Sequence, residues 1–342
     1  MFESVVTSPD SPVYGAHREQ DTFEIETRDA LYSGTSLQCF EFTGRTKDEL
    51  LQTLQKLTGA DVFPGPQPMS IDRSMFDAFR HDVFWVSKKT DGVRGAMMII
   101  NLHGHNIVAV FDRTLDRVFG FFIQNVPKPL YQNTIFDGEI VKNTIENTWT
   151  FLIFDAFVVA GIPQFHKQFP ERLHAAWASL QSYTYSPHDT VSLELKTFVP
   201  LHECTDSAIS DPRFADDGYV FMPQSKEYVF GHHTTFFKLK QHHTVDLKVD
   251  GRALLAYNTE TRRHVKACVL KEPASFEKGT IVECVLHEPN AIASKRVWRA
   301  ILERRDKSRA NSVFVVDKTL LNITENLQFQ DVKNIVSSQK SK

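Results

Sequence analysis

The 342-residue sequence contains only four cysteines, and no two of them form a C-x-x-C pair. A disulfide framework or a structural zinc site needs more cysteines or a tighter spacing, so we expect reduced thiols in an intracellular protein. The sequence also lacks an N-terminal apolar segment of the kind that directs secretion, and it has no apolar run of about 18 residues, the length that spans a membrane. We therefore expect a protein that is neither secreted nor bound to a membrane.

A strong positive charge is missing as well, because the formal net charge is −3. Proteins that coat nucleic acid regardless of its sequence need a broad cationic surface, and the composition argues against that class. It does not exclude a protein that binds only the end of an RNA. The charge is uneven, since seven Lys or Arg side chains fall within residues 292–309. Such a run is typical of either a solvated surface or an anion-binding site.

The sequence does contain enough apolar material for a packed core, with 42% hydrophobic and 24% charged residues. These proportions indicate a folded protein, and the length indicates about two domains. Short β-rich runs separated by turn residues predict antiparallel strands. The runs cover residues 83–86, 96–100, 107–111, 118–122, 135–141, 149–159, 191–198, 218–222 and 235–240.

Two helices are predicted in the same part of the chain. The first begins with a capping box formed by Thr46 and Glu49 and ends at Gly59. The second covers residues 171–181. One side of it carries Leu173, Trp177 and Leu180.

The pattern changes after Gln241, where the runs become shorter. They predict five strands in a stretch of about 80 residues, which suits a small barrel such as an OB-fold. From Asn311 onward the spacing of apolar residues predicts helix. The strand runs are 245–257, 263–271, 279–286 and 295–302, the first with a turn at Asp250-Gly251. The predicted domains are residues 1–241, an OB-fold over 242–323, and a helical tail over 324–342 that packs back on the first domain.

A reactive lysine is suggested by the string Lys89-Thr90-Asp91-Gly92-Val93-Arg94, which follows an apolar strand. Alone, this string is more typical of an exposed Asp-Gly turn. Four further strings follow it in order. They are Phe136-Asp137-Gly138-Glu139, Phe151-Leu152-Ile153-Phe154-Asp155, Asp217-Gly218-Tyr219-Val220-Phe221 and Phe237-Lys238-Leu239-Lys240. The last string points two lysines to the same face of a strand, either toward solvent or toward an anion.

In this order the strings resemble those of the covalent nucleotidyltransferase superfamily, which comprises capping guanylyltransferases and ATP-dependent DNA and RNA ligases. Further segments resemble the capping branch in particular. These are Phe63-Pro64-Gly65-Pro66-Gln67-Pro68-Met69-Ser70, Phe111-Asp112-Arg113, Lys196-Thr197-Phe198, Thr244-Val245-Asp246-Leu247 and Arg304-Arg305-Asp306-Lys307. Two positions depart from the family pattern. Leu302 replaces an arginine, which weakens or moves one phosphate contact, and Tyr219 replaces Leu or Ile, which changes the packing.

The resemblance implies an α+β protein with an antiparallel-sheet, ligase-like (ATP-grasp type) nucleotidyltransferase domain and a C-terminal OB-fold barrel. It also implies GTP:RNA guanylyltransferase activity, the reaction that caps mRNA 5′ ends. Lys89 would attack the α-phosphorus of GTP, release pyrophosphate and carry GMP covalently. The GMP would then pass to the 5′-diphosphate end of an RNA. Splitting one difficult transfer into two easier ones is the general advantage of covalent catalysis.

The same resemblance assigns roles to individual side chains. Thr90, Asp91, Gly92, Arg94, Glu139, Phe154, Lys226, Lys238, Lys240, Arg304, Asp306 and Lys307 would bind the nucleotide, and Asp217 would hold Mg²⁺ or Mn²⁺. Among them, Phe154 would stack on the guanine while Thr90 and Lys226 read its edge. Lys238 and Lys240 would contact the α-phosphate. Arg304, Asp306 and Lys307 would orient the leaving pyrophosphate.

Two other functions remain open from the sequence. One is a nucleic-acid ligase that uses ATP through the same lysine chemistry. The other is a non-catalytic module whose OB-fold binds RNA. For a capping enzyme, we expect the RNA 5′ end as partner, an RNA polymerase nearby, and separate triphosphatase and methyltransferase chains. The location would be the nucleus, or the host cytoplasm for a viral protein.

Overall fold

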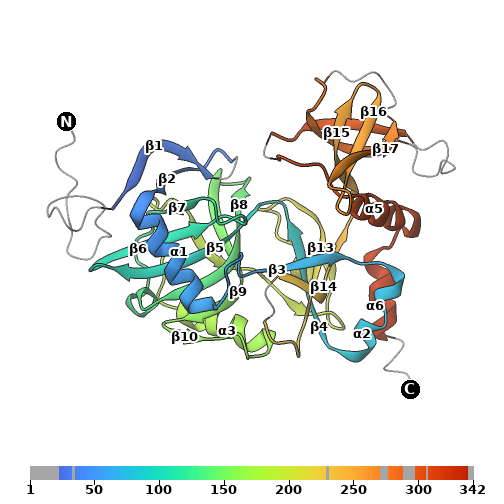
Figure 1. Ribbon diagram of the computed structural model, residues 1–342. Coiled ribbons are helices and arrows are strands. Elements are labelled where there is room, and N and C mark those ends of the chain that lie inside the picture. Colours follow the sequence, from blue (N-terminus) through green and yellow to red (C-terminus); the bar gives the residue numbers. More distant parts are fainter. Residues whose placement is uncertain are drawn as a thin grey trace. The chain divides into compact units, whose positions relative to one another are not determined.

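The computed structural model describes residues 23–32, 35–228, 231–269, 276–287, 297–305 and 307–337 (Figure 1). The chain packs into two compact units. The first unit consists of the described parts of Met1–Met69, Asp82–Asp216 and Val220–Phe237, and the second of Ser70–His81, Asp217–Tyr219 and the described parts of Lys238–Lys342. The domain boundaries expected from the sequence remain predictions. Within the described residues, no helix has the length and apolar character needed to cross a membrane.

A nine-stranded sheet forms most of the first unit, in the order β1-β2-β7-β6-β5-β8-β9-β10, with β11 also paired to β9. Neighbouring strands are antiparallel except for β11, which runs parallel to β9. This confirms the antiparallel α+β expectation. The strands are β1 Ile25–Leu31, β2 Gln38–Phe42, β5 Val93–Leu102, β6 His105–Phe111, β7 Val118–Gly120, β8 Thr134–Asn143, β9 Thr148–Val159, β10 Ile162–Pro163 and β11 Ser192–Leu195.

The long sheet is buried on both faces, which explains its continuous apolar runs. Alternate residues of β5 enter two different cores, Met97 and Ile99 one of them and Met98 and Ile100 the other. Side chains in a strand point to opposite faces in turn, so a strand covered on both sides needs apolar residues at every position. Helix α3 contributes to the first core and helix α1 to the second.

Helix α1 spans Gly44–Thr58, two residues earlier than its predicted start. The predicted capping box does not form. The Thr46 hydroxyl instead accepts a hydrogen bond from the Glu24 backbone N–H at 2.9 Å, and Glu49 pairs with Arg45 and with His103. The predicted end is correct, because Gly59 follows the helix in the left-handed conformation that favours glycine.

Helix α3 spans Phe169–Ser179, so it begins and ends two residues earlier than predicted. Phe169, Arg172 and Ala176 are buried, whereas Trp177 is 49% exposed. Arg172 is buried because it forms two hydrogen bonds, 2.8 and 2.7 Å long, with the Asp155 carboxylate. A charged side chain therefore occupies the position that an apolar pattern would give to a hydrophobic residue.

A second sheet has the order β12-β4-β13-β14-β3, and β13 and β14 each contribute residues to both units. Its strands are β3 Pro66–Ser70, β4 Phe84–Thr90, β12 Val199–Pro200, β13 Asp216–Pro223 and β14 Gly231–Lys240. Strand β4 ends on the predicted Lys89-Thr90 pair. Short helices complete this region, η2 at Arg73–Met75, α2 at Ala78–His81, η3 at Lys128–Tyr131 and α4 at Asp206–Ile209.

The second unit contains a five-stranded antiparallel sheet in the order β17-β16-β15-β18-β19. The strands are β15 Thr244–Asp250, β16 Ala253–Asn258, β17 Arg263–Val269, β18 Ile281–His287 and β19 Val297–Glu303, and they are followed by helices α5 Val313–Glu325 and α6 Phe329–Ser337. Hydrogen bonds among the described residues leave this sheet open between β17 and β19, and the expected OB-fold remains a prediction.

Candidate active site

The candidate nucleophile, Lys89, lies near the end of β4 and is half-buried. The turn that follows it is fixed from two sides. The Asp91 N–H donates to the Ala215 carbonyl at 2.8 Å. A Cβ atom at Gly92 would lie 2.5 Å from the Ile140 carbonyl oxygen of β8, so only glycine fits this position. The close approach of this turn to β8 fixes the segment that follows Lys89.

Thr90, the next residue, joins two charged side chains that are distant in the sequence. Its hydroxyl accepts a hydrogen bond from the Lys196 ammonium at 2.7 Å and donates one to the Glu139 carboxylate. The Lys196 Nζ also lies 3.7 Å from a Glu139 oxygen. Lys196 is only 8% exposed. Burial lowers the pKa of Lys196, the Glu139 carboxylate opposes that shift, and repulsion from Lys89 adds to it.

Phe154 supplies an aromatic ring at the same place and is half-buried. The Lys196 Nζ lies 5.9 Å from the ring centroid, and the Arg94 guanidinium carbon lies 5.2 Å from it. A planar base can stack on such a ring without regard to its hydrogen-bonding edges, while neighbouring cations bind its polar atoms. Thr90, Glu139, Phe154 and Arg94 were all predicted from the sequence, and the structure brings them together in the first unit.

The Arg94 side chain forms hydrogen bonds with other groups of the protein. Its guanidinium donates to both oxygens of Asp137, one of them at 2.9 Å, and to the Pro66 carbonyl at 2.5 Å. The Tyr228 hydroxyl donates to the same carboxylate at 2.8 Å. Burial alone would lower the pKa of Arg94, but the Asp137 carboxylate raises it above the ordinary value, so the guanidinium stays charged. These contacts tie Arg94 to Asp137 of β8 and to Pro66, and its role in nucleotide binding remains a prediction.

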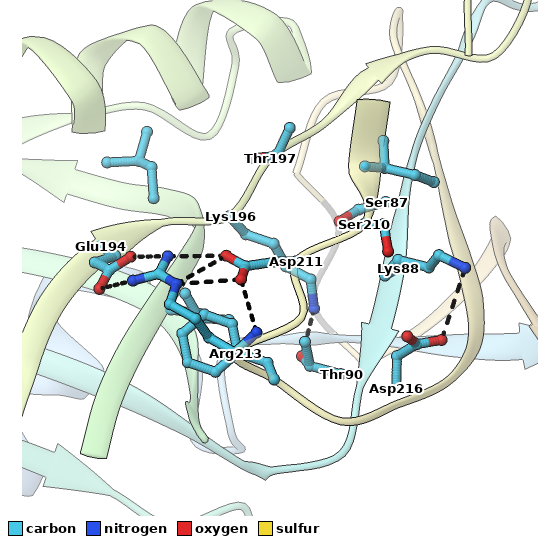
Figure 2. Close-up of a pocket in the computed structure, with 14 residues that line it drawn as sticks. Ser87, Lys88, Thr90, Glu194, Lys196, Thr197, Ser210, Asp211, Arg213 and Asp216 are labelled. Atoms are coloured by element: carbon cyan, nitrogen blue, oxygen red, sulfur yellow. Dashed lines mark hydrogen bonds and ion pairs between the residues drawn. The ribbon is translucent and has the colours of Figure 1, made fainter. Parts of the chain in front are cut away.

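A cavity of about 120 Å³ opens beside β4 and contains Thr90 and Lys196 among its lining residues (Figure 2). Lys88 also faces it, with an Nζ 2.8 Å from the Asp206 carboxylate and 3.9 Å from that of Asp216. Because Lys88 precedes Lys89 on a strand, the two side chains leave opposite faces of β4.

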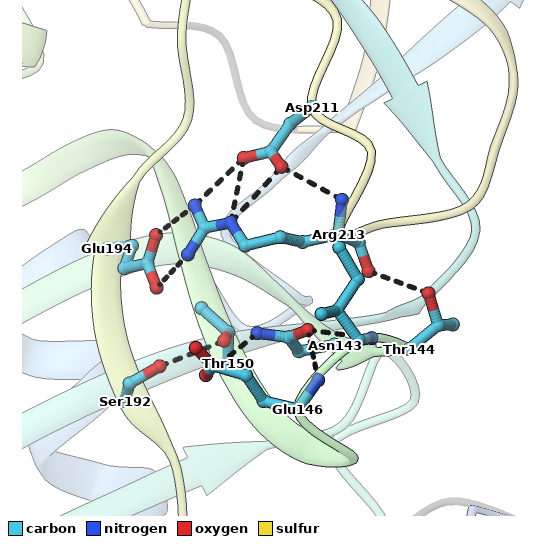
Figure 3. Close-up of polar contacts among 9 residues, drawn as sticks. Asn143, Thr144, Glu146, Thr150, Ser192, Glu194, Asp211 and Arg213 are labelled. Carbon is cyan, nitrogen blue, oxygen red and sulfur yellow. Dashed lines mark hydrogen bonds and ion pairs between the residues drawn. The ribbon is translucent and has the colours of Figure 1, made fainter.

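An ion-pair network shapes the other wall of the cavity (Figure 3). The Arg213 guanidinium forms two hydrogen bonds with Glu194, 3.0 and 2.7 Å long, and further ones with Asp211. The hydrogen bonds from Arg213 to Asp211 and Glu194 raise the pKa of this guanidinium. They fasten the segment before β13 to β11, and thereby fix the part of the cavity lining that Glu194, Asp211 and Arg213 form.

The second unit brings two other predicted residues together. The Lys240 ammonium lies 3.2 Å from the Asp217 carboxylate, and the Gln241 N–H donates to the Asp217 carbonyl at 3.0 Å. Gly218 has a φ of +142°, and a Cβ atom there would collide with the Leu239 carbonyl oxygen. The glycine allows β13 and β14 to approach closely, which sets the acid beside the lysine. Lys238 is half-buried on the same strand as Lys240.

The cations of the last motif are also held in the second unit. Asp246, which is 5% exposed, accepts hydrogen bonds from Arg304 at 3.0 Å and from Lys307. The Arg304 guanidinium also lies 3.7 Å from the Glu283 carboxylate. The predicted residue Asp306 lies outside the described residues. Lys226 has an exposed side chain, and its backbone carbonyl accepts a hydrogen bond from Arg172 at 3.2 Å, so its predicted role in reading the base remains a prediction.

No group of three or more His, Cys, Asp or Glu side chains that could hold a metal ion occurs among the residues with described positions. Such a group is not needed for Mg²⁺, which commonly binds one or two carboxylates together with substrate phosphates and water. Asp217, beside a lysine that can itself contact phosphate, fits that requirement. The predicted metal role of Asp217 therefore stays open to experiment.

Three residues of these clusters were not among the predicted site residues, namely Lys196, Asp137 and Asp246. Lys196 lies in the Lys196-Thr197-Phe198 segment, and Asp246 in the Thr244-Val245-Asp246 segment, both noted only as resemblances. A position within a motif was thus the signal that could have identified them. Asp137 stands two residues before Glu139 and was overlooked as part of a turn.

The chain is similar to known capping enzymes along most of its length. Residues 33–242 match the family described as mRNA capping enzyme, catalytic domain, and residues 217–332 match mRNA capping enzyme, C-terminal domain. The chain is 22% identical over 332 residues to an mRNA-capping enzyme subunit alpha of Schizosaccharomyces pombe, with 80% of each chain covered. It is 25% identical over 303 residues to an mRNA-capping enzyme of Caenorhabditis elegans, covering 78% of this chain but 46% of that protein.

Among solved structures, a mycobacterial DNA ligase D complexed with ATP is similar at 11% identity and a TM-score of 0.42. The match covers 72% of this chain and 96% of that one. The two family matches together span the first unit and most of the second, and they include the segments of Lys89, Glu139, Asp217 and Lys307. This chain belongs to the mRNA capping enzyme family and is a nucleotidyltransferase of the guanylyltransferase type.

Proposed function

We propose that Lys89 carries GMP as a covalent phosphoramidate and that the chain transfers this GMP to the 5′-diphosphate end of an RNA. The observation that carries the proposal is the cluster around Thr90. There a buried lysine, a carboxylate and a half-buried aromatic ring converge within the first unit, one residue beyond Lys89. These groups would supply a base-edge contact, a ribose contact and a stacking surface, and Lys89 would supply the nucleophile.

In the first step the neutral amine of Lys89 attacks the α-phosphorus of GTP. A P–N bond forms, the bond to the bridging oxygen breaks, pyrophosphate leaves with that electron pair, and the nitrogen loses one proton to solvent. In the second step a terminal phosphate oxygen of the RNA attacks the same phosphorus, the P–N bond breaks, and the departing nitrogen takes up a proton to become the amine again. A divalent cation bound at Asp217 would neutralise charge on the phosphate oxygens. Lys89 is thereby returned to its starting state.

Positioning and charge supply most of the catalysis in this type of transfer. Lys238 and Lys240 carry the positive charge that the α-phosphate needs. Glu139 already accepts a hydrogen bond from the Thr90 hydroxyl and has lone pairs left for a ribose hydroxyl. Arg304 and Lys307 are the cations proposed to orient the leaving pyrophosphate.

Lys196 is the side chain best suited to select guanine. An ammonium only donates hydrogen bonds, and guanine offers the acceptors O6 and N7, whereas adenine carries an amino donor in place of O6. Because Lys196 lies beside Phe154, a base stacked on that ring meets the ammonium at its edge. We therefore propose that Lys196 and Thr90 together favour GTP over ATP.

The decisive experiment exposes the protein to α-labelled GTP or α-labelled ATP with magnesium and analyses it on a denaturing gel. Covalent label from GTP, acid-labile and absent in Lys89→Arg, is the expected result, because arginine retains the charge but not the nucleophilic amine. Lys56→Ala, a change at an exposed position of α1, serves as the control and should keep the label. Label from ATP alone would contradict the proposal and would indicate a ligase instead.

Transfer to RNA needs a substrate whose 5′ end is a diphosphate. A hydrolase that removes the terminal phosphate of an RNA triphosphate has to supply that substrate, and we propose that it resides on a separate chain. The name subunit alpha of the S. pombe relative agrees with an assembly of several chains. Adding labelled diphosphate-ended and triphosphate-ended RNA to preformed lysyl-GMP tests this, and only the first should accept GMP.

A further inference from the structure

Strands β15, β16 and β17 lie side by side in the sheet of the second unit (Figure 1). The face of these strands that points away from the apolar core carries cations and aromatic rings. On β15, Val245, Leu247 and Val249 point into the apolar core of this unit. Lys248, between two of them, is half-buried and points outward. Lys248 is paired with Leu255 of β16, and Leu255 with Lys266 of β17. Residues directly opposite each other on adjacent strands share a face, so the two lysines lie on the same surface.

Two aromatic rings occupy the adjoining row of this surface. Tyr257 and His264 are directly paired between β16 and β17, and their rings lie 5.5 Å apart at an angle of 68°. The Arg309 guanidinium carbon lies 4.5 Å from the centre of the Tyr257 ring. Burial, followed by repulsion from Lys248 and Arg309, lowers the pKa of His264, so the imidazole is an uncharged ring at neutral pH.

We call these five residues the β15–β17 face. It comprises Lys248, Tyr257, His264, Lys266 and Arg309. Lys266 and Arg309 are exposed and the other three are half-buried. Flat rings interleaved with flexible cations are the combination that binds single-stranded nucleic acid, because bases stack on the rings and phosphates meet the cations.

The face is joined by hydrogen bonds to the cations of the last motif. The Asn311 N–H donates to the Asp246 carbonyl at 2.7 Å, and the Asp246 N–H donates to the Asn311 side-chain oxygen at 2.8 Å. The Tyr257 N–H donates to the Asn311 carbonyl at 2.9 Å. Asp246 in turn holds Arg304 and Lys307. One continuous part of the second unit therefore leads from phosphate-binding cations to the aromatic rings.

We propose that the β15–β17 face binds the first nucleotides of the RNA chain behind its 5′-diphosphate end. The proposal rests on the proposed function, because that function makes RNA the second substrate. The proposal goes beyond that function because it separates the binding of GTP from the binding of RNA. The nucleotide cluster of the first unit handles GTP, and the β15–β17 face adds affinity for RNA that extends past its terminal nucleotide.

Transfer from preformed lysyl-GMP tests the proposal with two diphosphate-ended acceptors, a dinucleotide and an RNA of about ten nucleotides, a length within the usual range for one such surface. The variants are Tyr257→Ala and Lys266→Glu, the second at an exposed position that leaves packing intact. We expect each to raise the KM for the long RNA roughly tenfold, the usual effect of losing one stacked base or phosphate contact. The KM for the dinucleotide and the rate of lysyl-GMP formation should stay unchanged.

Two further measurements guard against misfolding and separate this proposal from the proposed function. Tyr257→Phe should restore the KM, because the ring is retained. In direct binding of a fluorescent RNA, Lys266→Glu should reduce the slope of log affinity against log salt by about 0.7, the value for one contact to a single strand. Equal loss for both acceptors, or no loss for the long RNA, overturns the β15–β17 assignment. Absence of lysyl-GMP in the unaltered protein overturns the proposed function instead, and the salt slope then still decides whether the face binds RNA.

Discussion

The ring of Tyr219 stacks on the ring of Phe329, with centroids 4.2 Å apart and planes inclined by only 8°. Both residues belong to the second unit. Tyr219 stands where the family pattern has Leu or Ile, and it follows Asp217, the proposed metal carboxylate, by two positions. The departure from the pattern is therefore matched by a partner on α6, and the C-terminal helix braces the segment that bears the acid.

Phe329→Ala should weaken both stability and metal use. Loss of a half-buried aromatic partner costs about 2 kcal/mol of unfolding free energy, as for similar truncations. A looser Asp217 segment should raise the magnesium concentration that gives half-maximal lysyl-GMP formation. Urea unfolding and a magnesium titration measure the two effects. Phe329→Tyr preserves the stack and should behave like the unaltered protein, and a normal magnesium curve in Phe329→Ala would contradict the bracing role.

Gly218→Ala should abolish activity and lower stability by several kcal/mol, of the order of other buried backbone clashes. The added Cβ would collide with the Leu239 carbonyl oxygen, at a φ of +142°. Gly104→Ala is the matched control, because Gly104 also has a positive φ, +85°, but no atom lies within 4 Å of its added Cβ. It should cost only about 1 kcal/mol. Thermal unfolding compares the two variants, and similar losses for both would show that crowding at Gly218 is unimportant.

Lys307→Ala should separate the two half-reactions. Lys307 is proposed to orient pyrophosphate, which is present only in the first step, so lysyl-GMP formation should fall by about tenfold or more, the effect of losing about 1.4 kcal/mol of transition-state stabilisation. Transfer of GMP from lysyl-GMP prepared with a large excess of GTP should be nearly normal. Single-turnover assays of each step provide the measurement. Comparable losses in both steps would mean that Lys307 acts on the GMP moiety or on RNA.

Lys196→Met should weaken the preference for GTP without lowering the free energy of unfolding at neutral pH. Burial lowers the pKa of Lys196, so the folded protein binds this proton less tightly than the unfolded chain. The free energy of unfolding therefore rises as the pH rises through the pKa that Lys196 has in the folded protein, and it falls as the pH falls through that value. At neutral pH, the methionine variant should be at least as stable as the unaltered protein, while its preference for GTP over ATP falls about tenfold with one charged hydrogen bond. Denaturant melts between pH 7 and about 10, the usual range of lysine titration, should show a rise only for the unaltered protein.

Unchanged nucleotide preference in Lys196→Met would transfer the base-reading role to Thr90 or Lys226. Lys226→Met is the informative companion, since its exposed side chain makes it a neutral change for stability. A competition assay with labelled GTP and excess unlabelled ATP compares the three proteins directly.

The strands were predictable because the local pattern and the packing agree. Met97 and Ile99 enter one core while Met98 and Ile100 enter another, so burial on both faces appears in the sequence as an uninterrupted apolar run. Helix α1 was misplaced at its start because the hydroxyl of Thr46 serves Glu24, 22 positions away, and no local rule anticipates such a contact. Trp177 shares a side of α3 with Leu173 and Leu180 but is exposed, because the buried Arg172–Asp155 pair lies on the packed face of the helix.

The candidate site was predictable where its residues occur in recognisable strings. Lys89, Glu139, Phe154 and Asp217 stand in such strings, and Glu139 and Phe154 come together with Thr90 and Lys196. Lys196 was recognised as part of a motif, but its task depends on meeting Thr90, 106 positions earlier in the chain. Contacts over such distances depend on the fold, so a single sequence does not reveal them.

The carboxylate of Asp246 gives Arg304 and Lys307 a resident counter-ion. A product anion that binds these cations would have to compete with the Asp246 carboxylate. Because this carboxylate belongs to the same chain, its local concentration stays high. The residence time of the product anion should therefore be shorter than on a pair of unneutralised cations. On the proposed role of Arg304 and Lys307 in orienting pyrophosphate, the Asp246 carboxylate should reduce inhibition of the enzyme by released pyrophosphate.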